Sequence, residues 1–463
     1  MHPLTELIRT DMKPALGVTE PGAIAFAAAT ARRHARGAVK QVFLRLNSGL
    51  YKNAFTCGIP GTDRMGNLYA AALGAVGADP EKGLECLEGI TQAQSEQARA
   101  LVEAGKVRAE MSEITSRILI EAEVTTDRDT AEAVIRDSHT NIVSIRENGV
   151  PVFEASGGVG SPSPAEDPPE IHAYTLEQLV RYASTVPPEE LAMIREAFPM
   201  NLALLREGLE SSKTAFGPYL LRANGGRLIS RDEQKTASLL CCGAIDARGL
   251  GLSRPAMSIT GSGAHGIIAS MPLYAACQVQ GYPEEALLRA TALSYLVCMY
   301  IKEYSGRLSA FCGCAIAAGT GMACGLVLLR GGTLAQMSGT IRNMASSITG
   351  MICDGGNQGC AMKGVVAVDA AYRSADLAMA GISVDDIHGI NAPTPEETMR
   401  NMGRIASPGM EATEETIMEI LGEKEKKRYH SEAARQILCP VHVPERNLME
   451  QRTSGELLRQ HEG

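Results

Sequence analysis

The sequence predicts an α+β protein, in which an N-terminal domain with a small mixed sheet is followed by an all-helical domain. Over roughly the first 150 residues, short stretches alternate apolar and polar side chains with the period of two expected of half-buried strands. A segment rich in Gly, Pro, Ser and acidic residues follows at 157–170. Beyond it strand patterns nearly vanish, and Ala/Leu/Met-rich helical stretches broken at glycines continue to residue 421.

The predicted elements of the first domain are four strands and two Ala-rich helices. The strands are expected at 42–46, 118–124, 142–145 and 150–153, and the helices at 22–36 and 68–78. The last two strands flank Asn148-Gly149, a dipeptide that strongly indicates a two-residue hairpin turn.

The pattern therefore divides the chain into an α+β domain over 1–156, a linker over 157–170 and a helical domain over 171–421. Thr175, with Gln178 three residues later, forms a capping box that predicts a helix starting at Leu176. Residues 422–463 are charged and lack a clear apolar face, which predicts an appendage or interaction arm.

Composition and charge exclude several classes of protein. The chain has 463 residues and a net charge of −9, without the basic footprint that duplex binding requires. The N-terminus lacks the apolar region of a signal peptide, and the uncharged run 311–329 is mostly Gly, Ala, Cys and Thr, which favours a buried helix over a membrane span. We expect a cytoplasmic protein with a small-molecule partner, no nucleic acid and no membrane, and the sequence allows a homodimer.

Three of the twelve cysteines stand out by their setting. Cys312 precedes a Gly/Ala helix, and Cys353 and Cys360 flank the turning segment DGGNQG. A loop lets two sulfurs converge on one centre and offers backbone N–H groups to sulfide, as an Fe–S cluster requires. Ordinary buried cysteines are the alternative, and zinc fits less well because there are only three well-placed thiols and no nearby His. Three thiolates on a four-iron cluster would leave one iron open as a Lewis acid, which favours lyase chemistry.

Three further segments carry polar groups that suit a site. GSGAHG at 261–266 satisfies GxGxxG, but no strand pattern precedes it, so a dinucleotide fold is not expected. Its turn could hold a carboxylate, and His265 could carry a proton or merely cap the helix. Glu20, in GVTEPG, could cap a helix or act in the site, and His139 could be a hydrogen-bonded structural residue or a site residue.

The motifs GVTEPGAIAFAAA, YKNAFTCGIPGT, RILIEAEV, HTNIV, GSGAHG, LSAFC and TGMICDGGNQGCAMK occur in this order. Over residues 10–421 the chain thereby resembles the L-cysteine desulfidase family, relatives of the iron–sulfur L-serine dehydratases. The resemblance implies a [4Fe-4S] lyase without pyridoxal phosphate that splits L-cysteine into hydrogen sulfide, ammonia and pyruvate. It implies that the helical domain is catalytic and that the cluster ligands are Cys312, Cys353 and Cys360, whereas Cys314 does not match a ligand position. The other candidate residues are Thr19, Glu20, His139 and His265 for catalysis, and Asn53, Thr140, Ser262 and Gly263 for substrate binding.

The chain departs from the family pattern at one position. The family's N-terminal turn usually reads GCTEP with a cysteine that acts in catalysis, and Val18 stands there in this sequence. Because valine cannot move a proton, either another group does so or the substrate has changed. Arg64 could hold an extra anionic group if it faces the site. A serine-type dehydratase acting on a hydroxy-substrate is one alternative, and a non-catalytic protein with a structural or sensing cluster is the other.

Overall fold

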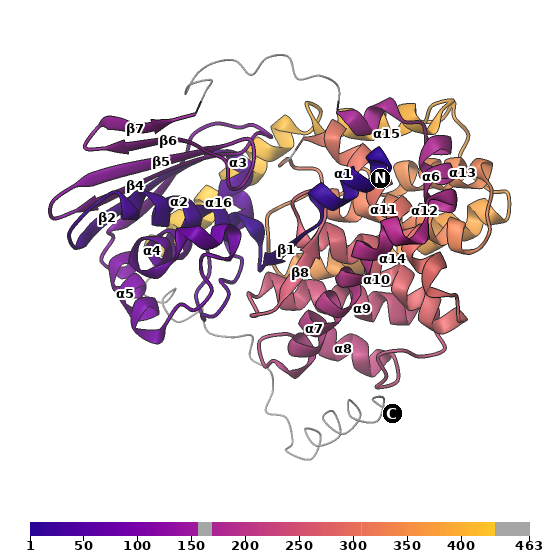
Figure 1. Cartoon of the computed structure of the whole chain (residues 1–463), viewed down its shortest axis with the longest axis horizontal. Coiled ribbons are helices and arrows are strands. Elements are labelled where there is room, and N and C mark those ends of the chain that lie inside the picture. The colour runs from indigo at the N-terminus through magenta and orange to yellow at the C-terminus, as the bar shows by residue number, and fades with distance from the viewer. Residues whose placement is uncertain (156–168, 307, 431–463) are drawn as a thin grey trace.

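The computed structural model describes residues 1–155, 169–306 and 308–430, so most of the predicted linker and residues 431–463 of the tail lie outside the described part. Figure 1 shows two lobes side by side, a sheet with helices packed on it and a larger helical bundle. The predicted α+β class is confirmed.

A six-stranded mixed sheet forms the N-terminal lobe. Its order is β3-β2-β4-β5-β6-β7, and only the β2–β3 pair is parallel. The strands are β2 (Val39–Leu46), β3 (Val107–Met111), β4 (Leu119–Thr126), β5 (Thr130–Arg136), β6 (Ile142–Glu147) and β7 (Val150–Glu154). Both predicted turn residues of the last hairpin, Asn148 and Gly149, have positive φ, as a type I′ turn requires. The four predicted strands are confirmed within a few residues, while β3 and β5 were not predicted.

Helices cover one face of this sheet. The helices of the lobe are α2 (Thr19–Arg33), α3 (Ser48–Ala54), α4 (Asn67–Gly77), α5 (Gln92–Glu103) and the 3₁₀ turn η1 (Pro80–Glu85). Along β4, Ile120, Ala122 and Val124 are fully buried beneath α2, and the residues between them are only partly covered. Helix α2 begins three residues before the predicted position because Pro21 falls in its first turn, where the missing N–H costs nothing.

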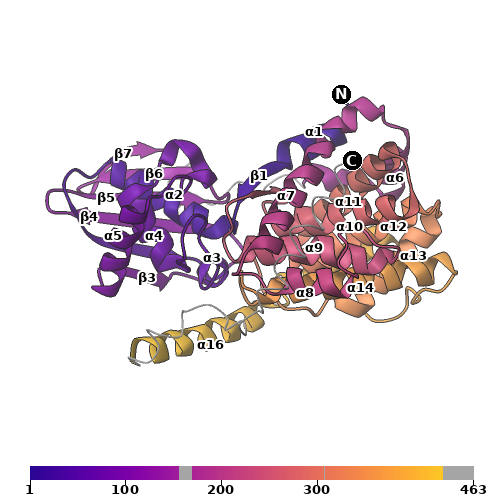
Figure 2. The same ribbon diagram turned by 90° about the horizontal axis from the view of Figure 1, so that it is seen from below.

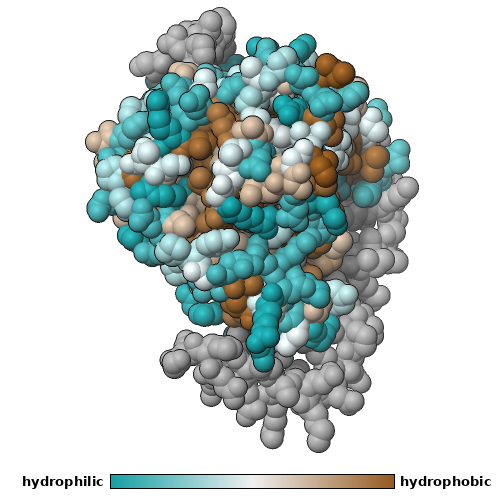
Figure 3. Space-filling view, turned by 90° about the vertical axis from the view of Figure 1, so that its right-hand side faces the viewer, coloured by the Kyte–Doolittle hydropathy of each residue, from teal (hydrophilic) through white to brown (hydrophobic). Residues whose placement is uncertain are grey.

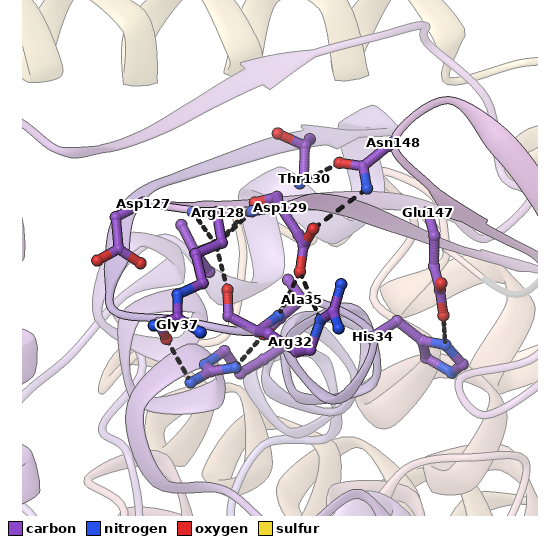
Figure 4. A network of polar contacts seen from close by, with 12 residues as sticks. Arg32, His34, Ala35, Gly37, Asp127, Arg128, Asp129, Thr130, Glu147 and Asn148 are labelled. Carbon is purple, nitrogen blue, oxygen red and sulfur yellow. Dashed lines mark hydrogen bonds and ion pairs between the residues drawn. The ribbon is translucent and has the colours of Figure 1, made fainter.

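The C-terminal end of α2 is tied to the turns of the sheet, as Figure 4 shows. His34 Nδ1 lies 2.7 Å from Glu147 Oε1, and the side chain of Asn148 accepts from the Thr130 amide at 2.9 Å and donates to Asp129 at 3.3 Å. These contacts fix the helix on the sheet, so that its N-terminal end is held out toward the other lobe (Figure 1).

The helical lobe is built around buried helices from α9 to α14. Its elements are η2 (Glu170–Ala173), α6 (Leu176–Thr185), η3 (Pro188–Glu196), α7 (Ala197–Glu210), α8 (Phe216–Ala223), α9 (Glu233–Gly249), α10 (Gly263–Gln280), α11 (Glu284–Ser305), η4 (Cys314–Ala318), α12 (Gly319–Leu329), α13 (Leu334–Ile348), α14 (Gly359–Met379) and α15 (Pro395–Ala406). The capping box of Thr175 and Gln178 is present as predicted. The uncharged run 311–329 forms η4 and α12 inside this lobe, so the expectation of a buried helix is confirmed. Within the described residues, no helix is both long and apolar enough to cross a membrane.

The helical lobe also departs from the all-helical prediction, because it contains the short strand β8 (Pro255–Ser258). This strand pairs antiparallel with β1 (Lys13–Leu16) from the start of the chain, and α1 (Pro3–Asp11) lies against α11 and η3. A four-residue strand whose partner lies some 240 residues away leaves no local pattern, which is why the sequence did not reveal it.

The chain returns to the N-terminal lobe at its end. Helix α16 (Glu411–His430) contacts α3 and runs alongside the first lobe in Figure 2. It continues without a break past residue 422, where the charged tail was predicted to start.

Candidate functional site

A cavity of about 490 Å³ is lined by residues of both lobes. Ten of the eleven candidate residues line it, and they come from six separate segments of the chain. These residues are Thr19, Glu20, Asn53, His139, Thr140, Ser262, His265, Cys312, Cys353 and Cys360. The eleventh candidate, Gly263, is not in the lining but directly follows Ser262, as the first residue of α10. The structure thus brings the candidates together, while the role of each stays a prediction.

The cysteine wall is assembled by two segments that pair with each other. Phe311 and Ile352 form an isolated antiparallel bridge, and the Cys312 amide donates to the Met351 carbonyl at 3.0 Å. This pairing brings the neighbouring Cys353 to the same wall. Cys360 lies in the first turn of α14, where helix N–H groups favour a thiolate. As predicted, residues 354–358 between the two cysteines are not helical, and α14 starts at Gly359, directly before Cys360.

Two lysines lie near these thiols, and each is paired with a carboxylate. Lys52 is 1% exposed, donates to the Ser309 carbonyl at 3.1 Å, and packs against Gly355 of the cysteine loop. Lys363 lines the same cavity and is paired with Asp354. A hydrogen bond from Cys314 holds the pKa of the Cys312 thiol below its ordinary value, whereas burial raises the pKa of Cys360 to about 11.

The donor set fits an iron–sulfur cluster better than a single metal ion. In the described ranges, no three His, Cys, Asp or Glu side chains are grouped closely enough to hold one ion. A cluster distributes its thiolate ligands over different iron atoms, so its cysteines line a cavity rather than converge on a point. Lys52 and Lys363 lie beside the cysteine loop, but each is already paired with a carboxylate, Glu414 and Asp354, so neither brings an unpaired charge to an anionic cluster.

His265 faces the same wall from the first turn of α10. Its Nδ1 is hydrogen-bonded to the Thr260 hydroxyl, and a Cβ placed on Gly313 would lie only 2.9 Å from its Nε2. Burial, together with the cations of Lys302 and Arg248, holds the pKa of His265 well below its ordinary value. The imidazole is therefore neutral at pH 7, with Nε2 directed toward the residue that follows Cys312.

The glycine-rich turn before α10 differs in one respect from the sequence prediction. A strand, β8, does precede it, contrary to the prediction. That strand is antiparallel to β1 and belongs to a two-stranded sheet, so the βαβ unit of a dinucleotide fold is still missing from the described residues. Ser262 at the N-cap makes no side-chain capping bond, which leaves first-turn amides of α10 available to an anion.

Contacts across the lobes position the remaining candidates. The Thr19 hydroxyl donates to the Gly261 carbonyl at 3.1 Å, and Asn53 Nδ2 donates to Glu20 Oε1 at 2.9 Å. Asn53 Oδ1 lies 3.8 Å from the Cys353 sulfur, so one amide links Glu20 to the cysteine wall.

His139 and Thr140 reach the cavity from the β5–β6 turn. A Cβ on Gly261 would lie 3.8 Å from the His139 ring, and Thr140 is exposed. His139 therefore packs beside the turn that precedes α10, and Thr140 lies at the outer part of the cavity wall.

Arg64 and Val18, two positions that the sequence analysis singled out, both lie outside the cavity lining. Arg64 contacts Asp63 at 3.2 Å and Glu96 at 3.1 Å and does not line the cavity, so it does not hold an extra anionic group there. Val18 is buried at the N-cap of α2, and its Cγ1 packs against Gly356 of the cysteine loop.

Sequence reasoning missed three buried cations near the cavity, namely Lys52, Arg248 and Lys302. Arg248 lies near the end of α9, two residues after Asp246, and Lys302 lies near the end of α11, directly before Glu303. Because each of these two cations has an acidic neighbour along the chain, no local signal distinguished it from an ordinary solvated charge.

Comparison with known proteins agrees with this picture. A family model described as serine dehydratase alpha chain matches residues 81–419. A UPF0597 protein of Clostridium botulinum strain Langeland is 39% identical, covering 91% of this chain and 99% of the relative. UPF0597 proteins of Oleidesulfovibrio alaskensis and Caldanaerobacter subterraneus subsp. tengcongensis are 36% and 34% identical, over 90% and 91% of this chain and 97% and 98% of their own length. The chain belongs to the serine dehydratase alpha chain family, and that family suggests an enzyme of the lyase type.

Proposed function

We propose that the protein is a [4Fe-4S]-dependent lyase that works without pyridoxal phosphate and eliminates the β-substituent of L-cysteine. Loss of the α-proton and of the β-thiol gives hydrogen sulfide and aminoacrylate, and the aminoacrylate tautomerises to an imine that water hydrolyses to ammonia and pyruvate. One observation carries the proposal: a single cavity combines the thiols of Cys312, Cys353 and Cys360 with the buried, neutral His265 and the uncapped start of α10.

The cysteine wall supports the leaving-group part of this reaction. Cys312, Cys353 and Cys360 would hold the cluster. When bound, such a cluster supplies Lewis acidity toward the sulfur that leaves.

The helical wall supports binding and proton removal. First-turn amides of α10 can accept the substrate carboxylate, because a helix N-terminus attracts an anion. Thr19 holds the preceding turn in place through its bond to the Gly261 carbonyl. His265 Nε2 can take the α-proton, since a neutral imidazole is a competent base at physiological pH.

L-Serine is the second candidate substrate. The family model that matches is that of a serine dehydratase chain, and Val18 replaces the cysteine that the desulfidase pattern carries. Elimination from L-serine releases water in place of hydrogen sulfide and otherwise follows the same steps.

The test is anaerobic purification followed by assay of L-cysteine and L-serine for keto acid, ammonia and sulfide. We expect broad visible absorption that bleaches in air, and keto acid with stoichiometric sulfide from L-cysteine. Cys312→Ser, Cys353→Ser and Cys360→Ser should each lose the colour, whereas the matched control Cys314→Ser should keep it.

Three results would contradict the proposal in different ways. Stoichiometric zinc without iron would exclude the cluster. Keto acid from L-serine alone would establish the second candidate. An iron–sulfur chromophore with no turnover of either amino acid would favour a structural or sensing cluster.

A further inference from the structure

Arg248 is a buried cation that no carboxylate neutralises within the described residues. It lies in the last turn of α9, is 7% exposed, and makes one hydrogen bond, from Nη2 to the Thr19 hydroxyl at 3.4 Å. Its Nε is buried, with no hydrogen-bond partner in the part of the chain that the structure describes. An isolated buried charge costs several kcal/mol, so a structure that retains one is expected to balance it with a ligand.

The guanidinium lies directly behind the two helix N-termini of the cavity. A Cβ on Gly263, the first residue of α10, would lie 2.7 Å from Arg248 Nε, so glycine is needed there to admit the arginine. Thr19, which receives the Arg248 bond, is the first residue of α2. Neither helix has a side-chain cap at its start. The positive ends of two long helices and a guanidinium therefore meet at one point of the wall.

The carboxylates near this point suit a zwitterion. Glu20 and Asp11 line the same cavity, Glu20 bonded to Asn53 and Asp11 to the Thr260 amide. The lining as a whole carries both signs of charge, which favours a zwitterion over a ligand with two negative charges. Its charged residues are Asp11, Glu20, Asp137, Glu303, Lys13, Lys302 and Lys363. An amino acid fits this arrangement with its carboxylate at the start of α10 and its ammonium group directed toward Glu20 or Asp11.

We propose that Arg248 makes this cavity selective for amino acids with a free α-carboxylate. The carboxylate accepts from first-turn amides of α10, and Arg248, which donates to the Thr19 hydroxyl, supplies the counter-charge from behind Gly263. Because Arg248 does not line the cavity, it is a positioning residue. The selectivity excludes amides, esters and peptides extended at the carboxyl group. The inference rests on the proposed amino-acid lyase function and specifies its substrate class.

The test measures binding with ligands that cannot react. L-Alanine has the ammonium and carboxylate of the substrate but no β-leaving group, and L-alaninamide lacks the carboxylate charge. Calorimetry on the anaerobically purified holoenzyme should show L-alanine bound at least about tenfold more tightly than L-alaninamide, as expected for a hydrogen-bonded charge. Arg248→Met should remove most of that preference by weakening L-alanine alone, and Arg248→Lys should keep part of it.

Two further variants make the result specific. Arg254→Met, which removes an arginine outside the cavity wall on the neighbouring segment, should retain the wild-type preference. Thr19→Val, which removes the hydroxyl that Arg248 contacts, should reduce the preference even if Arg248→Met fails to fold. Visible absorbance and circular dichroism establish that each variant is folded and loaded.

The proposal is overturned if wild-type protein binds the two ligands equally or does not bind L-alanine. It is also overturned if the folded Arg248→Met and Thr19→Val variants keep the full preference. The binding measurement distinguishes this proposal from the lyase proposal. An Arg248-dependent preference without turnover would refute only the proposed reaction. Turnover without such a preference would refute only the role of Arg248.

Discussion

A buried ion pair joins the C-terminal helix to the cysteine wall. Lys52 Nζ on α3 lies 2.5 Å from Glu414 Oε2 on α16, and the two residues are 1% and 4% exposed. At an effective dielectric constant of about 20, their attraction is roughly 7 kcal/mol before desolvation is counted. Removing one partner leaves the other charge buried alone, which typically costs about 3–5 kcal/mol. We therefore expect Glu414→Gln to lower the free energy of unfolding by about 3 kcal/mol, since the amide can retain a hydrogen bond to the ammonium.

Removing both charges should cost much less than removing one. Glu414 Oε1 has no hydrogen-bond partner among the described residues, so the pair is incompletely satisfied. Replacing such a pair with apolar side chains of similar volume is often neutral or stabilising. Lys52→Met combined with Glu414→Leu should thus lie within about 1 kcal/mol of wild type.

The assay is urea unfolding of the full chain under anaerobic conditions, followed by circular dichroism. Glu415→Gln is the matched control, because this neighbour on α16 is exposed and should change stability by less than about 0.5 kcal/mol. The reasoning would be refuted if Glu414→Gln cost less than about 1 kcal/mol, or if the double replacement cost as much as the single one.

Three further variants test the site. Gly313→Ala should lower kcat by about 10²-fold, because the new methyl would lie 2.9 Å from both His265 Nε2 and Lys302 Cδ. An unchanged kcat would mean that turnover does not depend on the exact positions of these two side chains. The pKa of His265 is held low by burial, so the unfolded chain alone gains this proton below about pH 6.5. Stability should therefore fall by about 1.4 kcal/mol more in wild type than in His265→Asn as the pH drops from about 7.5 to about 5.5 in denaturant titrations; equal losses would refute this. Val18→Cys should change L-cysteine turnover by less than about threefold, because Val18 packs on Gly356 and does not line the cavity; a rise of about 10²-fold or more would show that a proton carrier belongs there.

The parts of the fold that the sequence predicted are those with local signals. Alternation along β4, the Asn148-Gly149 turn and the capping box at Thr175 each act within a few residues, and all three are present. The pairing of β1 with β8 depends on a partner distant in sequence. No pattern within either four-residue strand distinguishes it from a loop, and that pairing was missed.

The candidate site likewise contains some residues with a local sequence signal and others without one. Cysteine spacing and glycine-rich turns identified residues that line one cavity, because glycines mark places where the backbone approaches another group closely. Lys52 and Arg248 lie behind that wall and Lys302 lies in it, and the importance of all three depends on which side chains face them after folding. Burial and the absence of a carboxylate beside Arg248 are properties of the packed molecule, so only the structure could reveal them.

The position of Val18 bears on how the reaction proceeds without the cysteine of the desulfidase pattern. Val18 occupies the N-cap position of α2 without capping it and packs against the loop between Cys353 and Cys360, so its side chain fills space next to the cysteine wall. A base for the α-proton must lie inside the cavity, must be unprotonated, and must be held in place. Among the candidate residues His265 meets these conditions, because it lines the cavity, its pKa is lowered by burial, and Thr260 fixes its other ring nitrogen. The proposed elimination therefore does not require a thiol at position 18, provided that His265 Nε2 reaches the α-carbon of a substrate whose carboxylate is held at the start of α10.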